Sequence, residues 1–450
     1  MDIVVCFALF LAAMLFCLVK DFSLAWALLF ALVLFFALGL RRGYGAKALV
    51  KMAWSKMPKS MIVLRILFFI GLLTGLWRSC GTIAFFIYHG IRVITPSLFI
   101  LVAFLLTVLL SYALGTSFGV ASTAGVVLMA LARSGGVSEA VTAFVILSGI
   151  YFGDRGAPTS SCASLLAASL VAALTETDLY GNVRRMFQTA ALPYALCLIA
   201  YTVFSFRNPI VTVDETMLDA LAESFVISPW ALVPALIMLI LPLLRVPIRR
   251  AMAISAAAAF VITVTVQGGS VADALRIMVV GYHPTEGLLA SVVSGGGLVS
   301  MLTPFLMIPL AALYTGILEG TGALTQAQSV LERSAERIGR FPTMILLSLL
   351  AAMVLCNQTI VVMMEHQLIG AVYAKDGAEH EELAMDIANS GVTIAGLIPW
   401  CIACAVPLSM LGVGVEALPY ACLLYLIPLC YLFTKRFFFP AKSKGSETPV

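Results

Sequence analysis

The sequence predicts an all-α polytopic membrane protein, built from two structural repeats, with inversion expected and with broken helices at the midplane. Composition supports this fold class, and an internal repeat supports its organisation. Of the 450 residues, 62% are hydrophobic and 11% are charged, whereas soluble domains have about 45–50% apolar and about 25% charged residues. The mean hydropathy is +1.05. A water-soluble surface needs more charge, whereas lipid-facing side chains must be apolar.

The apolar runs predict about 10 to 13 spanning helices in one continuous membrane domain, at about 20 residues for each span. Ile3–Val19 follows an acidic residue and has no convincing cleavage site, so we interpret it as a retained first helix. The segments near Gly149–Pro158 and Gly391–Pro399 carry glycine, proline and polar groups at membrane depth and are expected to be interrupted helices. The expected spans lie near residues 3–19, 22–40, 61–77, 97–114, 117–132, 140–152, 157–174, 188–206, 228–244, 251–267, 298–318, 343–363, 393–412 and 417–434.

Basic residues predict which loops face the cytoplasm. We expect an N-terminal helical hairpin with a basic cytoplasmic loop (1–59), transport repeat 1 (60–206), connecting helices (207–297), transport repeat 2 (298–435) and a cytoplasmic tail (436–450). Positive charge gathers in three short clusters that abut apolar helices, which argues against a nucleic-acid partner and for the cytoplasmic side of the membrane. These clusters are Arg41, Arg42, Lys47, Lys51, Lys56, Lys59 and Arg65; Arg245, Arg249 and Arg250; and Lys435, Arg436, Lys442 and Lys444.

Motifs of nucleotide-driven pumps and of hydrolytic enzymes are missing from the sequence. It has no Walker loop, GxSxG or GxGxxG, and its four histidines show no metal-ligand spacing. An intramembrane aspartyl protease needs a GxGD motif, but Tyr151 stands where that motif needs glycine. We therefore expect neither an enzyme nor a cofactor.

An internal repeat with an offset of 241 residues relates two parts of the chain. Leu73-Thr-Gly-Leu-Trp-Arg-Ser-Cys-Gly-Thr-Ile83 resembles Tyr314-Thr-Gly-Ile-Leu-Glu-Gly-Thr-Gly-Ala-Leu324. The same offset pairs Pro158 with Pro399 and sets the polar pair at 116–117 against the polar pair at 357–358. Transporters are commonly built from two such repeats, with their sites at broken helices in corresponding positions. Generic similarity of glycine-rich membrane helices is the alternative.

Asp154 is the leading candidate for a functional residue. It lies in the apolar stretch Ser148-Gly-Ile-Tyr-Phe-Gly-Asp-Arg-Gly-Ala-Pro-Thr-Ser-Ser161, where an unpaired carboxylate is costly and usually faces a cavity or a partner. Ser160 and Ser161 add oxygens one turn further on. A carboxylate that alternates between binding a proton and binding a cation meets the minimum requirement of exchange. We expect a water-reachable hollow around it, lined by the kinked segments of both halves.

Structural roles compete with function at several charged residues. Asp154 alternatively forms an ion pair with Arg155 or caps a helix that begins near Ala157. Arg78 and Glu319 occupy equivalent positions of the repeat near a helix end, where they lie at an interface or pair with each other, and we favour a structural role for both.

Further polar residues at membrane depth are candidates for ligands of a substrate or cation. Such side chains ligate a substrate or simply bond across helices. These candidates are Thr116, Ser117, Asn357, Gln358, Asn389 and Thr393. For Thr116 and Ser117, close packing of a small-residue helix is the favoured alternative.

Several motifs resemble the NhaC family of sodium/proton antiporters, in order from about residue 60 to 435. They are Gly115-Thr-Ser-Phe-Gly119, Phe152-Gly-Asp-Arg-Gly-Ala-Pro-Thr-Ser160, Gly296-Gly-Leu-Val-Ser-Met301, Gly316-Ile-Leu-Glu-Gly-Thr-Gly322, Ser390-Gly-Val-Thr393, Leu397-Ile-Pro-Trp400 and Leu411-Gly-Val413. The resemblance implies an ion-transporter-type fold with inverted repeats, a cation site where broken helices meet, and a prokaryotic plasma membrane as the location. It makes Asp154 a functional acid.

The chain departs from the family pattern at several positions. Ser161, Ala388 and Asn389 stand where the resemblance implies acidic residues, and Arg155 replaces a lysine. Each acidic loss removes a strong oxygen ligand for a hard cation. The other departures are Val392 for threonine, Cys401 for asparagine and Gly295 for arginine.

The sequence therefore predicts a secondary active transporter, a cation/proton antiporter with Asp154 as coupling acid. The alternative is a proton- or ion-coupled permease or antiporter for an amino acid or organic carboxylate, whose carboxylate meets a positive half-helix N-terminus at 156–158. Expected partners are a small cation and a proton, or a small organic solute, with the lipid bilayer and, as an option, a second copy in a homodimer. Sodium is the metal considered at Asp154; the sequence does not establish it.

Overall fold

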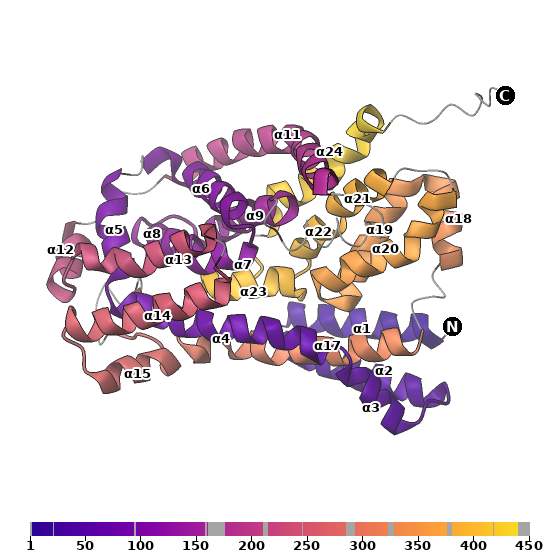
Figure 1. Cartoon of the computed structure of the whole chain (residues 1–450), viewed down its shortest axis with the longest axis horizontal. Helices are drawn as coiled ribbons and strands as arrows, with labels where there is room; N and C mark the ends of the chain where they lie inside the picture. The colour runs from indigo at the N-terminus through magenta and orange to yellow at the C-terminus, as the bar shows by residue number, and fades with distance from the viewer. Residues whose placement is uncertain are drawn as a thin grey trace.

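The computed structural model is helical throughout the residues that it describes, which are 2–20, 22–93, 96–157, 160, 176–209, 215–244, 246–284, 293–322, 328–375, 380–416 and 418–439. Among these residues the only β pairing is an isolated antiparallel bridge between Tyr282 and Gly295. Helices α1, α2, α4 and α17 run along the long axis of the molecule (Figure 1). The prediction of an all-α membrane protein is confirmed.

The N-terminal helices form a layer with a helix from far along the chain. The bounds are α1 (Asp2–Val19), α2 (Leu24–Arg41), α3 (Ala46–Trp54) and α17 (Leu302–Gly320). A Cβ on Gly316 would overlap the main chain of Met52 and Ala53, so α17 can lie directly on α3 only with glycine there. An ion pair between Lys56 and Glu319 closes the same end of this layer.

The chain then folds into a group of helices around α9. Their bounds are α4 (Met57–Ser79), α5 (Thr82–Val93), η1 (Pro96–Leu98), α6 (Phe99–Leu114), α7 (Ser117–Val120), the π-helical turn η2 (Ala121–Gly125), α8 (Val126–Ser134), α9 (Glu139–Gly156) and α11 (Glu176–Arg207). Helices α4 and α5 bend by 59° where Gly81 adopts a φ of +81°, a conformation that favours glycine.

Connecting helices pack beside α4 and lead to α17. They are α12 (Glu215–Ser224), η3 (Pro229–Leu232), α13 (Val233–Leu243), α14 (Ile248–Thr265), α15 (Val271–Val280) and η4 (Leu298–Met301). Trp77 Nε1 donates to Ser255 Oγ at 3.1 Å, and Ser255 donates to the main chain of Pro234 at 2.7 Å. These bonds join α4, α14 and α13 inside the molecule.

The last group of helices contains further breaks. Their bounds are α18 (Gln328–Ile338), α19 (Arg340–Leu355), α20 (Gln358–Lys375), α21 (His380–Ala388), α22 (Gly391–Ile394), η6 (Ala395–Leu397), α23 (Ile402–Leu411), η7 (Leu418–Tyr420) and α24 (Cys422–Phe438). The segment 381–411 bends by 49° between η6 and α23. It contains the predicted interruption near Gly391–Pro399.

Helix bounds correspond between the two groups at the offset of 241 residues seen in the sequence. Helix α6 (99–114) corresponds to α19 (340–355), the segment from α7 to α8 (117–134) to α20 (358–375), and the starts of α9 and α21 are residues 139 and 380. The ends of α4 and α17 correspond in the same way. In addition, Gly115 and Cys356 both end their helices in the left-handed conformation.

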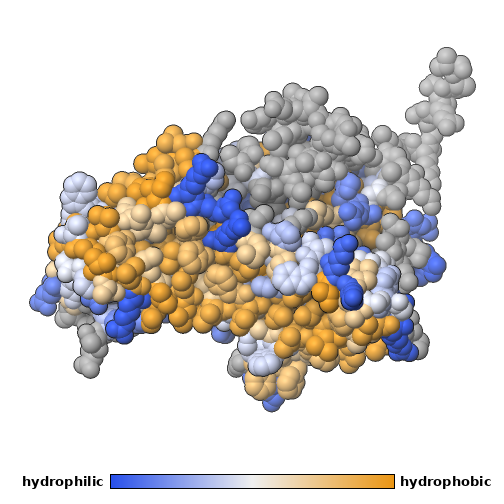
Figure 2. Space-filling view, turned by 60° about the horizontal axis from the view of Figure 1, so that its bottom comes forward, coloured by the Kyte–Doolittle hydropathy of each residue, from blue (hydrophilic) through white to orange (hydrophobic). Residues whose placement is uncertain are grey.

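Several described helices are long and apolar enough to cross a membrane. Four are straight (24–41, 117–134, 183–207 and 298–320), two are bent pairs (64–89 and 381–411), and shorter apolar helices cover 5–19, 99–114, 229–242 and 340–355. Hydrophobic side chains dominate the described part of the surface in Figure 2, which is the surface expected beside lipid. The chain is a multi-pass membrane protein.

One expected span differs from the structure. The span near 343–363 is two helices, because Cys356 takes a φ of +51° and ends α19. The interruption expected near Gly149–Pro158 lies at the end of that segment, where α9 stops at Gly156 and Ala157 takes an extended backbone. Most of the expected span near 157–174 lies outside the described residues.

Candidate functional site

Two glycines set α9 against α6. A Cβ on Gly153 would overlap the main chain of Ser111 and Tyr112, and a Cβ on Gly149 would overlap the side chain of Thr107. The main chains therefore approach more closely than any other residue would permit. This contact brings Asp154, the next residue of α9, to the end of α6, where the left-handed Gly115 starts the break before α7.

The breaks in the second group of helices meet at the same place. Ile402 N donates to the main-chain oxygen of Cys356 at 2.9 Å, which joins the break between η6 and α23 to the break between α19 and α20. Gln358 Nε2 donates to Val392 O at 2.8 Å, and Tyr151 of α9 donates to Ala403 O at 2.5 Å. Interrupted segments from both halves of the chain thus surround one stretch of α9.

Asp154 is enclosed by neutral side chains from these segments. The residue is 5% exposed, and its carboxyl group interacts with the side chains of Ser117, Ser160 and Gln358. Among the described residues, no arginine, lysine or histidine nitrogen lies within ion-pair distance of its carboxylate. Ser160 Oγ also donates to the main-chain oxygen of Asp154. The water-reachable hollow expected around Asp154 stays a prediction, because residues 161–175, which follow closely in the chain, lie outside the described residues.

Helix N-termini add to the electrostatics around Asp154. Ser117 is the first residue of α7 and Gln358 is the first residue of α20, at corresponding positions of the two groups. The N-terminal end of a helix carries partial positive charge from its unpaired amide groups. Two such ends favour an anionic group beside them, and the Asp154 carboxylate is such a group.

Arg155 points to a different set of partners and does not pair with Asp154. Its Nη2 donates to Asn389 Oδ1 at 2.6 Å, to Thr189 Oγ1 at 2.9 Å and to Met186 O at 2.9 Å. The predicted alternative of an Asp154–Arg155 ion pair is wrong for the described structure. Asn389, a candidate ligand in the sequence, thus accepts a hydrogen bond from the Arg155 guanidinium.

Three other sequence candidates have local roles. Thr116 accepts a hydrogen bond from Gly119 N and caps α7. Asn357 accepts from the amides of residues 359 and 360 and caps α20. The buried Thr393 donates to Ser390 O at 3.1 Å. Ser161 lies outside the described residues.

Arg78 and Glu319 do not pair with each other, so that alternative is wrong. Glu319 pairs with Lys56, whereas Arg78 Nη1 donates to Thr74 O of its own helix at 2.8 Å. Arg78 therefore has no carboxylate partner among the described residues. A helix beginning near Ala157, which Asp154 was expected as an alternative to cap, would lie mostly outside the described residues.

Sequence reasoning missed two buried acids. Glu365 in α20 is fully buried, and neither carboxylate oxygen has a hydrogen-bond partner. The Ser348 hydroxyl interacts with Glu365 but donates to Met344 O at 2.8 Å. A Cβ on Gly391 would overlap the Glu365 carboxylate. An acid inside the apolar run of residues 358–375 was the signal that would have revealed it.

The second missed acid, Asp386, belongs to a buried ion cluster. Lys435 pairs with Asp386 and, at 2.8 Å, with Glu382, which also accepts from Arg340 at 2.9 Å. The Tyr373 hydroxyl donates to Asp386 as well. The charges of the two cations and the two acids balance, so we interpret this cluster as a structural one that holds α19, α21 and α24 together.

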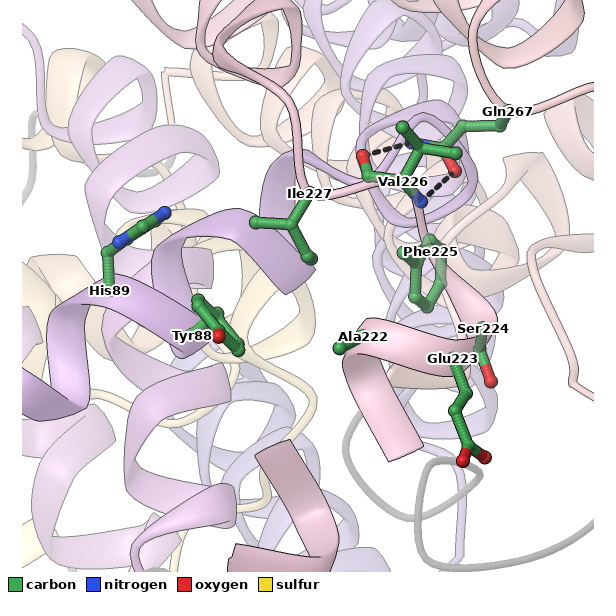
Figure 3. A pocket seen from close by; sticks show the side chains of 9 residues that line it. All are labelled: Tyr88, His89, Ala222, Glu223, Ser224, Phe225, Val226, Ile227 and Gln267. Carbon is green, nitrogen blue, oxygen red and sulfur yellow. Dashed lines mark hydrogen bonds between the residues drawn. The ribbon is translucent and has the colours of Figure 1, made fainter. Parts of the chain in front are cut away.

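Asp154 lines none of five hollows that described residues bound. One of about 600 Å³ is bounded by Tyr88 and His89 of α5 on one side and by residues 222–227 on the other (Figure 3). In its wall Gln267 exchanges two hydrogen bonds with the main chain of Val226, at 3.0 and 3.1 Å. These bonds tie the loop after α12 to the end of α14.

The helical fold with broken segments from both groups of helices is of the kind found in secondary transporters. The profile of the Na+/H+ antiporter family matches residues 164–435. The chain belongs to this Na+/H+ antiporter family, as a divergent member of NhaC type.

Curated relatives align over most of the chain. The chain is 27% identical over 407 residues to the malate-2H(+)/Na(+)-lactate antiporter of Bacillus subtilis, covering 89% of this chain and 86% of the relative. It is 24% identical to the Na(+)/H(+) antiporter NhaC of Alkalihalophilus pseudofirmus, with 84% of each chain covered. It is 27% identical to the arginine/ornithine antiporter ArcD of Halobacterium salinarum, covering 79% of this chain and 74% of that protein.

Proposed function

We propose that the protein exchanges a small cation for protons and that Asp154 is the acid that couples the two fluxes. The supporting observation is the enclosed carboxylate, which has no counter-cation among the described residues and interacts with Ser117, Ser160 and Gln358. An enclosed anion needs a positive partner. A proton or a cation meets that need, and competition between them at one carboxylate is sufficient for exchange.

The cycle follows from the arrangement of the broken helices. Ionised Asp154 accepts a cation from one side of the membrane, with the hydroxyl oxygens of Ser117 and Ser160 as further ligands. The opposite side then gains access, a proton replaces the cation, and the neutral carboxyl returns. Because the breaks around Asp154 come from both halves of the chain, movement of one half against the other opens the site alternately.

Inverted repeats are part of this proposal. Helices α4 and α17 occupy corresponding positions at the offset of 241 residues, and they run antiparallel: Lys56 precedes α4 and pairs with Glu319 near the end of α17, whereas Gly75 near the end of α4 lies against Gly297 just before α17. Antiparallel equivalents are what an inverted pair requires.

Proton flux in proteoliposomes tests the role of Asp154. A pH dye inside the vesicles reports the internal pH. Addition of sodium, lithium or potassium should change this pH more than addition of choline does. Asp154→Asn should abolish this flux, while Asp273→Asn, at an exposed position of α15, should preserve it. Cation-evoked flux through Asp154→Asn at the wild-type rate would refute the assignment.

A second candidate is coupled exchange of an organic solute, which the names of two relatives favour: one carries malate and lactate, the other arginine and ornithine. The same vesicles loaded with such solutes distinguish the two functions. Solute uptake without any cation-evoked proton flux would favour the second candidate.

A further inference from the structure

A second hollow, of about 410 Å³, lies where the end of α4 meets α9, α23 and the loop at residues 294–297. Arg78, Arg133, Gly295 and Ser409 are among its lining residues. Helix α4 begins at the basic loop that the positive-inside rule places in the cytoplasm. Arg78 comes 22 residues after Lys56, roughly 33 Å along the helix, so this hollow lies toward the external side.

The hollow carries one unmatched positive charge. Arg78 is 7% exposed, and its Nε atom has no hydrogen-bond partner. The other cation in the wall, Arg133, is already matched: its Nε donates to Glu139 at 2.7 Å and its Nη2 to Leu411 O at 3.1 Å. No described carboxylate is within ion-pair distance of Arg78. A buried guanidinium without an anion is strongly unfavourable, so a ligand that supplies one gains affinity.

Gly295 lies beside the edge of that guanidinium formed by Nε and Nη2. A Cβ built at this position would meet Nε and Nη2 of Arg78 at 3.9 and 4.0 Å, and no closer atom. Its neighbours differ, since a Cβ on Gly296 or Gly297 would overlap the main chain of Gly75 or Gly281. Crowding thus explains the glycines at 296 and 297, whereas a Cβ at residue 295 would make only ordinary contact with Arg78.

We propose that this hollow binds a small organic carboxylate, held side-on by Nε and Nη2 of Arg78. A carboxylate matches the planar fork of a guanidinium with two parallel hydrogen bonds. Ser294 and Ser409 offer hydroxyls to a second polar group of the ligand, and Met301 and Met410 line the hollow for its carbon chain. The volume is in the usual range for small-molecule sites.

This inference deepens the second candidate function by naming a site for the solute, and it does not depend on Asp154. Binding can therefore be measured without transport. Its failure would leave cation/proton exchange untouched, and failure of the Asp154→Asn test would leave the Arg78 site untouched.

Calorimetric titration of the detergent-purified, delipidated full chain with lactate and with succinate tests the proposal. We expect saturable binding of at least one of the two, weakened at least tenfold in Arg78→Gln and partly retained in Arg78→Lys. Arg276→Gln removes an exposed arginine of α15 outside this hollow and should bind as the wild type does. Equal affinity of Arg78→Gln and the wild type would overturn the proposal.

A second variant guards against misfolding of Arg78→Gln. Ser409→Phe keeps Arg78 but fills the hollow, and it should also lose binding. Parallel titrations with inorganic phosphate and with short-chain phosphatidylglycerol separate a soluble carboxylate from a lipid headgroup, which offers the same anionic chemistry. Binding of these phosphates without binding of lactate or succinate would overturn the carboxylate assignment, as would full binding by Ser409→Phe.

Discussion

Gly153→Ala should destabilise the protein because the substitution forces α6 and α9 apart. The added Cβ would overlap the main chain of Ser111 and Tyr112, and main chain cannot rotate away as a side chain can. Overpacking of this kind costs roughly 1–3 kcal/mol. Gly156→Ala is the matched control three residues further along α9, since its Cβ would meet only Met186 Cβ at 3.8 Å, an ordinary contact.

Thermal unfolding of the two variants in the same detergent measures this difference. Gly156→Ala should be neutral or slightly stabilising, by up to about 1 kcal/mol, because alanine is the better helix former. Gly153→Ala should unfold at a lower temperature and lose proton flux, since Asp154 would shift relative to Ser117. Equal stability of the two variants would show that the close approach of α6 and α9 does not position the site.

Two further predictions concern the buried acids. Lys435→Met leaves Asp386 and Glu382 without their shared cation and should destabilise the protein by about 3–5 kcal/mol. Arg436→Met, at an exposed neighbouring position, should change stability by less than about 0.5 kcal/mol. Chemical denaturation in detergent compares the two variants, and equal effects would show that the ion cluster does not hold the helices together. Glu365→Gln removes an acid whose carboxylate oxygens have no hydrogen-bond partner. The variant should be at least as stable as the wild type, and its proton flux should be slower. A marked loss of stability with normal flux would instead assign Glu365 a structural role.

Part of the arrangement around Asp154 could be predicted from the sequence. A carboxylate in an apolar run is costly enough to require partners, and the offset of 241 residues marked positions 116–117 and 357–358 as equivalent. Ser117 and Gln358 do converge on Asp154. Their neighbours Thr116 and Asn357 turned out to be helix caps, a role that their residue types and position before a helix would have allowed one to predict.

Other features depend on tertiary packing that a sequence pattern does not contain. The direction of Arg155 away from Asp154 follows from the placement of Asn389 and α11 beside it. The break at Cys356 uses a left-handed conformation that non-glycine residues rarely adopt, so no local signal marks it. Asp386 carries no such signal either, because its partner Lys435 is distant in the chain.

Proton release on cation binding tests the central claim most directly. The purified protein is placed in weakly buffered detergent solution with a pH indicator, and sodium, lithium, potassium or choline is added. If a cation and a proton compete for the carboxylate of Asp154, a transported cation releases protons from the wild type and none from Asp154→Asn, and choline releases none from either. Undiminished release from Asp154→Asn would contradict the account.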